Sequence, residues 1–268
     1  MRQPAVFIPH GAGPCFFMEW TRGPADTWAR TEAFLRGLVA GLPERPRAIL
    51  VVSSHWEEPV FTVGSGEAPQ LIFDYYGFPE HAYELTFPAP GSPELATRVQ
   101  ALLKGAGIAS AADPARGWDH GVFVPLKLVT PDADIPVVQL SLKASLDPAE
   151  HLAAGRALAP LRDEGVLIVG SGMSWHNMRG FSPAYTQASA DFDAWLAEAV
   201  QDPGKLARWA EAPNGRLAHP REEHLAPIFV AAGAAEGEPA EVVFRDTVMD
   251  VVVSAHQFGA PQLAARAA

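Results

Sequence analysis

Cysteine, positive charge and long apolar runs are all scarce in this chain of 268 residues. Cys15 is the only cysteine, so an intrachain disulfide and a four-cysteine zinc site are both excluded. The formal net charge of -11 argues against nucleic acid as a partner, because nucleic-acid-binding proteins usually carry a basic face. No apolar run approaches the ~20 residues of a membrane span, and the first residues do not resemble a signal peptide. We therefore expect a protein of the reducing cytoplasm, with no membrane partner.

Short apolar runs alternate with segments of helical spacing. The runs at 6–8, 48–52, 137–142 and 166–169 are continuous, which indicates strands buried on both faces, as in a parallel sheet covered by helices. Helices are expected at 27–42, 93–104, 148–162, 187–200 and 222–235, and a β-rich stretch at 241–253. This order predicts one α/β domain over residues 1–268, a three-layer sandwich with a mostly parallel central sheet and helices on both faces. The aromatic loop at 65–90 is expected to cover a site, and the tail after Gly259 to fray.

Three of the predicted strands lead into histidines. His10 and His55 follow the first two apolar runs, and His176 follows the run at 166–169 after a Gly-Ser-Gly segment. Because ligands bind outside the carboxyl ends of the strands in an open α/β sheet, these three side chains could enter one crevice. Imidazole suits iron and zinc. A single histidine after a strand is more often a hydrogen-bonding loop residue, and periodicity alone does not decide between the two interpretations.

The remaining histidines give weaker signals. His120 lies in the loop G-W-D-H-G-V-F, and Pro220 could open the helix that carries His224. We expect His151 on a solvated helix surface and assign no role to His256. Further candidates without a firm assignment are His81 in the aromatic loop and His219. Cys15 could be a soft metal ligand, but a small buried side chain is the expected role.

Seven stretches carry a resemblance to a known family. They are P-H-G-A-G-P, V-V-S-S-H-W, G-F-P-E-H-A-Y with F-P-A-P-G-S-P, W-D-H-G-V-F-V-P-L, D-A-D-I-P-V-V-Q-L-S, G-S-G-M-S-W-H-N and E-E-H-L-A-P-I. In this order the chain resembles the DODA-type members of the class III, LigB-like extradiol ring-cleaving dioxygenases. Two stretches depart from the family pattern, at Pro9-His10-Gly11-Ala12 and at Arg221-Glu222-Glu223-His224. Both departures retain the histidine, so they bear on the substrate rather than on the metal.

The resemblance implies a role for each matching histidine. It makes His10, His55 and His224 metal ligands and His176 the acid/base beside the metal, which some family sites also count as a ligand. It makes His120 a residue of the substrate shell. The implied metal is non-haem Fe(II), with Zn(II) often found in the purified fold, and the implied substrates are O2 and a catechol, which binds iron through both oxygens. A neutral histidine, with an ordinary pKa of ~6.5, then takes the second phenolic proton.

Two alternatives remain open at this point. A zinc hydrolase could use His176 or Glu223 to activate a metal-bound water, although the chain has no H-E-x-x-H motif. A non-enzymatic binding protein is also possible, since the Memo-like relatives of this fold are known chiefly through interactions. Four aromatic residues could line the substrate ring or simply fill the core: Tyr75, Trp118, Phe123 and Trp175. The identity of the catechol, the ring bond that opens and the oligomeric state do not follow from the sequence.

Overall fold

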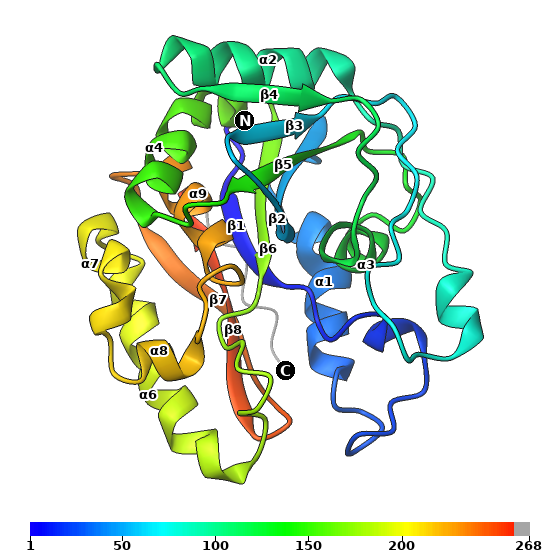
Figure 1. Cartoon of the computed structure of the whole chain (residues 1–268), viewed down its shortest axis with the longest axis vertical. Coiled ribbons are helices and arrows are strands. Elements are labelled where there is room, and N and C mark those ends of the chain that lie inside the picture. The colour runs from blue at the N-terminus through cyan, green and yellow to red at the C-terminus, as the bar shows by residue number, and fades with distance from the viewer. Residues whose placement is uncertain (260–268) are drawn as a thin grey trace.

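The computed structural model describes residues 1–259, and in this part of the chain eight strands form one sheet (Figure 1). The strands are β1 (Ala5–Pro9), β2 (Ala48–Glu58), β3 (Phe61–Gly64), β4 (Ser110–Asp113), β5 (Val137–Lys143), β6 (Val166–Gly172), β7 (Ala240–Val248) and β8 (Val251–Phe258). The helices are α1 (Ala29–Gly41), α2 (Pro93–Gly105), α3 (His120–Val129), α4 (Pro148–Leu158), α5 (Pro160–Asp163), α6 (Thr186–Ala199), α7 (Pro203–Ala207), α8 (Gly215–Ala218) and α9 (Ala226–Ala234). The tail that the sequence predicts to fray lies outside the described residues.

The centre of the sheet is parallel. The strand order is β4-β3-β5-β2-β6-β1-β8-β7, in which β5, β2, β6 and β1 run in one direction. The antiparallel pairings lie outside this centre, between β3 and β5 and along β1, β8 and β7. The β-rich stretch predicted at 241–253 is thus an antiparallel hairpin at one edge.

Two separate cores cover the two faces of the sheet. Val6 and Ile8 of β1 belong to the core under α1 and α3, whereas Phe7 belongs to the other core, with Phe229 of α9. In Figure 1, α1 and α3 accordingly lie on one side of the central strands, and α4, α6 and α9 on the other. Alternate side chains of a strand point to opposite faces, so a continuous apolar run supplies both cores. The predicted three-layer α/β class is confirmed.

Helix ends follow the signals in the sequence. The Ser92 hydroxyl accepts a hydrogen bond from the Leu95 N–H at 3.2 Å and begins α2, while the Asp147 carboxylate caps the first turn of α4. The single helix predicted at 148–162 is divided into α4 and α5 at Pro160. Proline has no N–H to give to a preceding turn, which is why α4 ends there.

The expectation that Pro220 opens the helix carrying His224 is wrong. The helix α9 begins only at Ala226, with Pro227 in its first turn, and His224 lies before it. The residues between form turns, in which the N–H of Ala226 donates to the Glu222 carbonyl at 2.8 Å. The actual start still agrees with the preference of proline for the first helical turn.

The expectation of a solvated His151 is also wrong. Its side chain is fully buried, with the ring edge-on to Phe61 at 5.1 Å between centroids. The Nδ1–H donates to the Asp147 carbonyl at 2.8 Å, and Nε2 accepts the Lys143 N–H at 3.2 Å. His151 therefore joins the start of α4 to the end of β5, a long-range packing that the local charge pattern does not reveal.

The carboxyl ends of three neighbouring strands meet in the middle of the sheet. Pro9 of β1 pairs with Gly172 of β6, and β6 lies between β1 and β2. The His10 N–H continues the ladder by donating to the Gly172 carbonyl at 3.1 Å. This edge is where ligand sites form in open α/β sheets.

Candidate functional site

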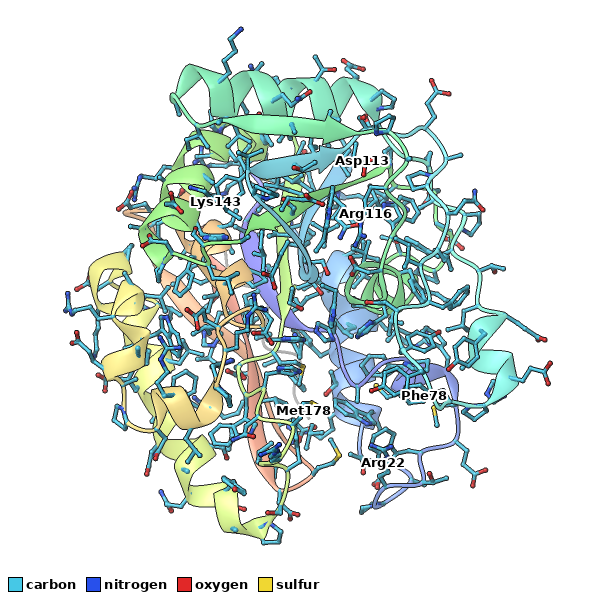
Figure 2. All side chains as sticks on the ribbon, viewed as in Figure 1. Arg22, Phe78, Asp113, Arg116, Lys143 and Met178 are labelled. Atoms are coloured by element: carbon cyan, nitrogen blue, oxygen red, sulfur yellow. The ribbon has the colours of Figure 1, made fainter. Side chains whose placement is uncertain are left out.

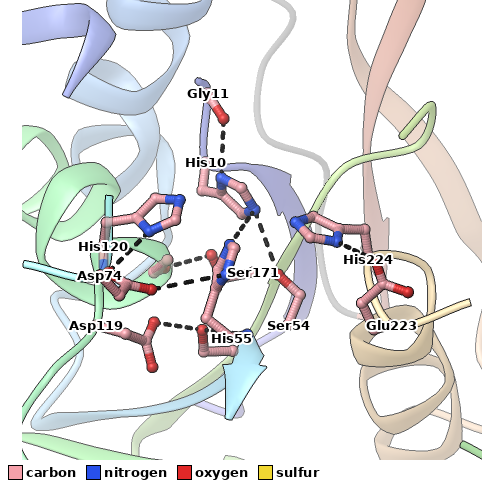
Figure 3. A network of polar contacts seen from close by, with 12 residues as sticks. His10, Gly11, Ser54, His55, Asp74, Asp119, His120, Ser171, Glu223 and His224 are labelled. Carbon is pink, nitrogen blue, oxygen red and sulfur yellow. Dashed lines mark hydrogen bonds and ion pairs between the residues drawn. The ribbon is translucent and has the colours of Figure 1, made fainter. Parts of the chain in front are cut away.

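Three histidines from distant segments converge at this edge (Figure 3). His10 directly follows β1, His55 lies in the last part of β2, and His224 lies between α8 and α9. One ring nitrogen from each lies within 4.8 Å of those of the other two. The Nε2 atoms of His10 and His55 are only 3.4 Å apart.

Glycines create the space in which these side chains meet. A Cβ on Gly172 would lie 2.2 Å from the His224 carbonyl oxygen, a distance that atoms do not adopt. That carbonyl accepts the Met173 N–H at 3.0 Å, which fixes the loop of His224 against the end of β6. Gly11 has a φ of +87°, so the turn after His10 also needs glycine.

Hydrogen bonds set the tautomer of two of the rings. The Nδ1–H of His10 donates to the Gly11 carbonyl at 2.9 Å, and that of His224 donates to Glu223 Oε1 at 3.0 Å. A carbonyl or carboxylate oxygen can only accept, so Nε2 of each ring carries no proton, and that of His10 lies 3.3 Å from the Ser54 hydroxyl. The Nε2 of His224 is buried and has no hydrogen-bond partner within the described residues. An unpartnered buried imidazole nitrogen next to two others is what a metal site requires.

Burial lowers the pKa of all three imidazoles. The pKa values of His10 and His224 fall well below the ordinary value, first because of burial and then because neighbouring histidines would repel a positive charge. Burial and His120 lower the pKa of His55 to about 3, although Asp74 opposes the shift. All three rings are therefore neutral near pH 7, the form in which histidine binds a metal. Three such ligands fit a divalent iron or zinc ion and leave positions open.

His120 lies beside this group and is held by Asp74. It is the first residue of α3, and its ring lies 3.9 Å from that of His55 between centroids. Asp74 Oδ1 accepts both the backbone N–H and the Nδ1–H of His120 at 2.9 Å. Burial alone would raise the pKa of Asp74, but the hydrogen bonds and charge of His120 outweigh it and lower this pKa. Asp74 was not predicted from the sequence, where its only signal is its place in the aromatic loop.

His176 lies next to the three histidines rather than among them. Its ring stacks on that of His224, with 3.3 Å between centroids and 11° between planes. Its Nδ1 is 3.5 Å from Glu223 Oε1, the oxygen that also accepts from His224. Burial would raise the pKa of Glu223, but the hydrogen bond and charge of His176 and the charge of Arg221 lower it. With 20% of its side chain exposed, His176 stands between the buried cluster and solvent.

A buried carboxylate ties β2 to α3 behind the histidines. Asp119 Oδ1 accepts from the Ser53 hydroxyl at 2.6 Å, and Oδ2 accepts from Arg116 at 2.8 Å and from the Gln139 amide. Ser53 in turn accepts the backbone N–H of His55 at 3.2 Å. Asp119 directly precedes α3, so one carboxylate fixes the segment of His55 and the helix that begins with His120.

Comparison with known proteins shows to which family this chain belongs. Residues 4–258 match the family model described as the catalytic LigB subunit of aromatic ring-opening dioxygenase. The chain belongs to this family. The resemblance read from the seven motifs is thereby confirmed.

Relatives of this LigB-family chain include named enzymes. It is 46% identical over 208 residues to the 4,5-DOPA dioxygenase extradiol of Beta vulgaris, covering 75% of this chain and 78% of the relative. It is 39% identical over 256 residues to the protein of that name from Escherichia coli K12, covering 88% and 87%. A crystal structure of an uncharacterized Escherichia coli K12 protein superposes with a TM-score of 0.75 at 31% identity, covering 96% of this chain and all of the other.

Five histidines line one cavity of about 1090 Å³. His10, His55, His120, His176 and His224 all contribute to its walls. The structure therefore brings together the five histidines that were predicted from the sequence to form the site. His81 and His219 are not among the residues that line the cavity.

No helix in residues 1–259 has the length and apolarity to cross a membrane.

Only one of the four suggested aromatic residues lines this cavity. Tyr75 does so, and its hydroxyl donates to the Ala82 carbonyl at 2.5 Å. Burial and the charges of Tyr83 and Asp74 raise its pKa. The other three belong to the cores: Trp118, Phe123 and Trp175.

Cys15 is buried, as expected of a small core residue. Its Sγ accepts the Ala12 N–H at 3.3 Å, and burial raises the pKa of the thiol. Its thiol therefore stays protonated rather than forming the thiolate that metals bind.

Proposed function

We propose that this chain is a non-haem extradiol dioxygenase that opens the ring of a catechol with O2, with Fe(II) held by His10, His55 and His224. The observation that carries the proposal is the convergence of three neutral imidazoles, one of which has a buried, unpartnered Nε2. The ring-opening chemistry comes from the family and from the names of the relatives. The same ligands could hold Zn(II) in the purified protein.

The protein keeps the metal-facing nitrogens free of protons. Hydrogen bonds from Nδ1 of His10 and of His224 leave the lone pair of Nε2 available, and burial keeps the rings neutral. When bound, ferrous iron supplies the redox chemistry that allows O2 to react with an aromatic ring. The tasks left to the side chains are to orient the catechol and to move its protons.

We assign these two tasks to the two remaining cavity histidines. His120 donates its Nδ1–H to Asp74, so its Nε2 is an acceptor for a substrate hydroxyl. His176 is partly exposed, and its Nδ1 lies 3.5 Å from Glu223 Oε1, so its ring is held beside the metal ligands with access to the cavity. His176 is therefore proposed to take the second phenolic proton and return it after ring opening.

We also propose that residues 1–268 form a single catalytic domain in the cytoplasm. The described strands all belong to one sheet, and the lone cysteine fits a reducing compartment. The proposed substrates are a small aromatic catechol and O2. The net charge of -11 argues against a nucleic-acid partner.

The test is turnover of a catechol panel by protein purified without oxygen and loaded with Fe(II). A ring-opened semialdehyde is yellow, and one O2 is expected to be consumed for each molecule formed. Zn(II)-loaded protein is the matched control and is expected to give no yellow product. Ester or amide hydrolysis by the zinc form would instead support the hydrolase, and binding without any turnover would support a non-catalytic, Memo-like protein.

A further inference from the structure

The cavity is larger than the ring chemistry requires. Cavities of about 300–1,000 Å³ enclose drug-sized molecules, and this one measures about 1090 Å³. The histidines account for only one part of its wall. The remaining volume of the cavity must be filled by another group on the substrate or by water.

An apolar cluster separate from the two sheet cores forms much of the remaining wall. It includes Trp20, Trp28, Met173 and Met249, all of which line the cavity. The rings of Trp20 and Trp28 meet edge-to-face at 5.6 Å and give this wall a rigid part. Methionine side chains adapt to irregular shapes, so the rest of the wall can follow the ligand.

The mouth of the cavity also exposes apolar side chains. Met178 is 72% exposed and Tyr76 is 90% exposed, and both line the cavity. Of the residues that line the cavity, Figure 2 shows Met178 on one side of its mouth and Phe78 with Arg22 on the opposite side. Exposed apolar groups that continue a pocket outward mark a surface for binding.

Met249 holds its place at the expense of backbone strain. The hairpin turn between β7 and β8 consists of Met249 and Asp250, with φ of +47° and +70°. Such two-residue turns normally take Asn-Gly or Gly-Gly, because other side chains are strained at positive φ. Ala133 and Leu146 have similar positive φ away from the cavity, so the strain supports a role for the Met249 thioether only together with its place in the cavity wall.

The charged residues that line the cavity are of both signs, so they do not favour a ligand of one particular charge. Arg30 donates to the carboxylate of Asp246 at 2.7 Å, and this pair spans α1 and β7. The other charged lining residues are exposed and of both signs: Arg22, Asp26 and Asp250. Apart from the histidines and the Arg30–Asp246 pair, the buried wall is therefore apolar.

We propose that this wall is a subsite for a bulky aryl substituent on the catechol ring. The inference rests on the proposed function for the catechol end of the substrate. It adds that the preferred substrate is an extended, two-ring molecule rather than a catechol with a small or charged side chain. The thioethers of Met249 and Met173 and the indole of Trp28 contact the second ring.

The test is calorimetric binding to Zn(II)-loaded protein, which requires no turnover. We expect 4-phenylcatechol to bind at least ~10-fold tighter than 4-methylcatechol, and L-DOPA no tighter than 4-methylcatechol. Equal affinities, tighter binding of L-DOPA, or no binding of 4-phenylcatechol would overturn the inference. Ring opening of small catechols by the iron form would show that the proposed function survives that failure. A measured preference for the aryl catechol without any ring opening would support the subsite and overturn the proposed function.

Two variants of the same turn separate ligand binding from stability. Met249→Gly is expected to melt no lower than the parent, because strain is relieved, but to lose most of the preference for 4-phenylcatechol. Asp250→Gly relieves the neighbouring strained position and keeps the thioether, so it is expected to retain the preference. If both variants keep the preference, or both lose it, the role of Met249 is wrong.

Discussion

Replacing Asp119 by asparagine tests whether the buried carboxylate holds the site together. Asparagine has nearly the same shape but keeps only one acceptor oxygen and turns an NH2 group toward a neighbouring donor. The oxygen can still accept from Ser53, whereas the side chains of Arg116 and Gln139 lose their acceptor. The change therefore leaves a positive charge without its partner.

The structure sets the size of the expected loss. Removing one partner of a buried ion pair costs about 3–5 kcal/mol. Arg116 is 18% exposed and its guanidinium lies 4.7 Å from the centre of the Trp56 ring, so part of its charge stays stabilised. We expect a loss of about 2–4 kcal/mol in the free energy of unfolding, or about 4–7 °C in Tm. A neutral amide oxygen accepts the Ser53 hydroxyl more weakly than a carboxylate does, so the segment of His55 is held less firmly and metal affinity is expected to fall ~10-fold.

Thermal melting of metal-free protein and competition with a chelator measure the two effects separately. Asp163→Asn is the matched control, since Asp163 is 59% exposed in its pair with Arg2 and surface pairs contribute about 0–1 kcal/mol. An Asp119→Asn protein that melts like this control and holds metal as tightly as the parent would refute the reasoning.

Three further predictions concern the histidines. His10→Ala is expected to lose the metal, as elemental analysis would show, whereas His81→Ala, at an exposed position, is the control and keeps it. His176→Gln is expected to retain the metal but lose ~10²–10⁴-fold in turnover, and release of iron instead would make it a ligand. Burial lowers the pKa of His219 and of His256 to about 3, so the folded state binds fewer protons than the unfolded state below pH ~6.5. Stability contributed by each is present above pH ~6.5 and falls by about 2 kcal/mol at pH 5, which denaturant unfolding of metal-free protein would detect; a flat profile would contradict this.

The sequence predicted the parts of the site that depend on local order. A buried parallel strand has a continuous apolar run, so the positions of His10 and His55 at strand ends could be found directly. His224 could not be found in this way, because a turn rather than a strand presents it. Its place in the candidate site came from the family resemblance.

The parts that sequence reasoning missed depend on contacts across the fold. Asp74 holds His120 from 46 residues earlier in the chain, and no spacing rule connects the two. His151 has a charged neighbour in sequence, Glu150, which is typical of a solvated helix face, yet the end of β5 covers it. Tertiary packing decided both cases.

The Gly-Ser-Gly end of β6 has a consequence for how this protein tolerates mutation. Gly170 lies under the Pro227 carbonyl of α9 and Gly172 under that of His224, and an added methyl group would come within 2.5 Å of the first oxygen and 2.2 Å of the second. A random library screened for activity should therefore yield dead clones at two residues that carry no functional group. At Gly172, alanine would displace His224 without changing the chemistry of that side chain.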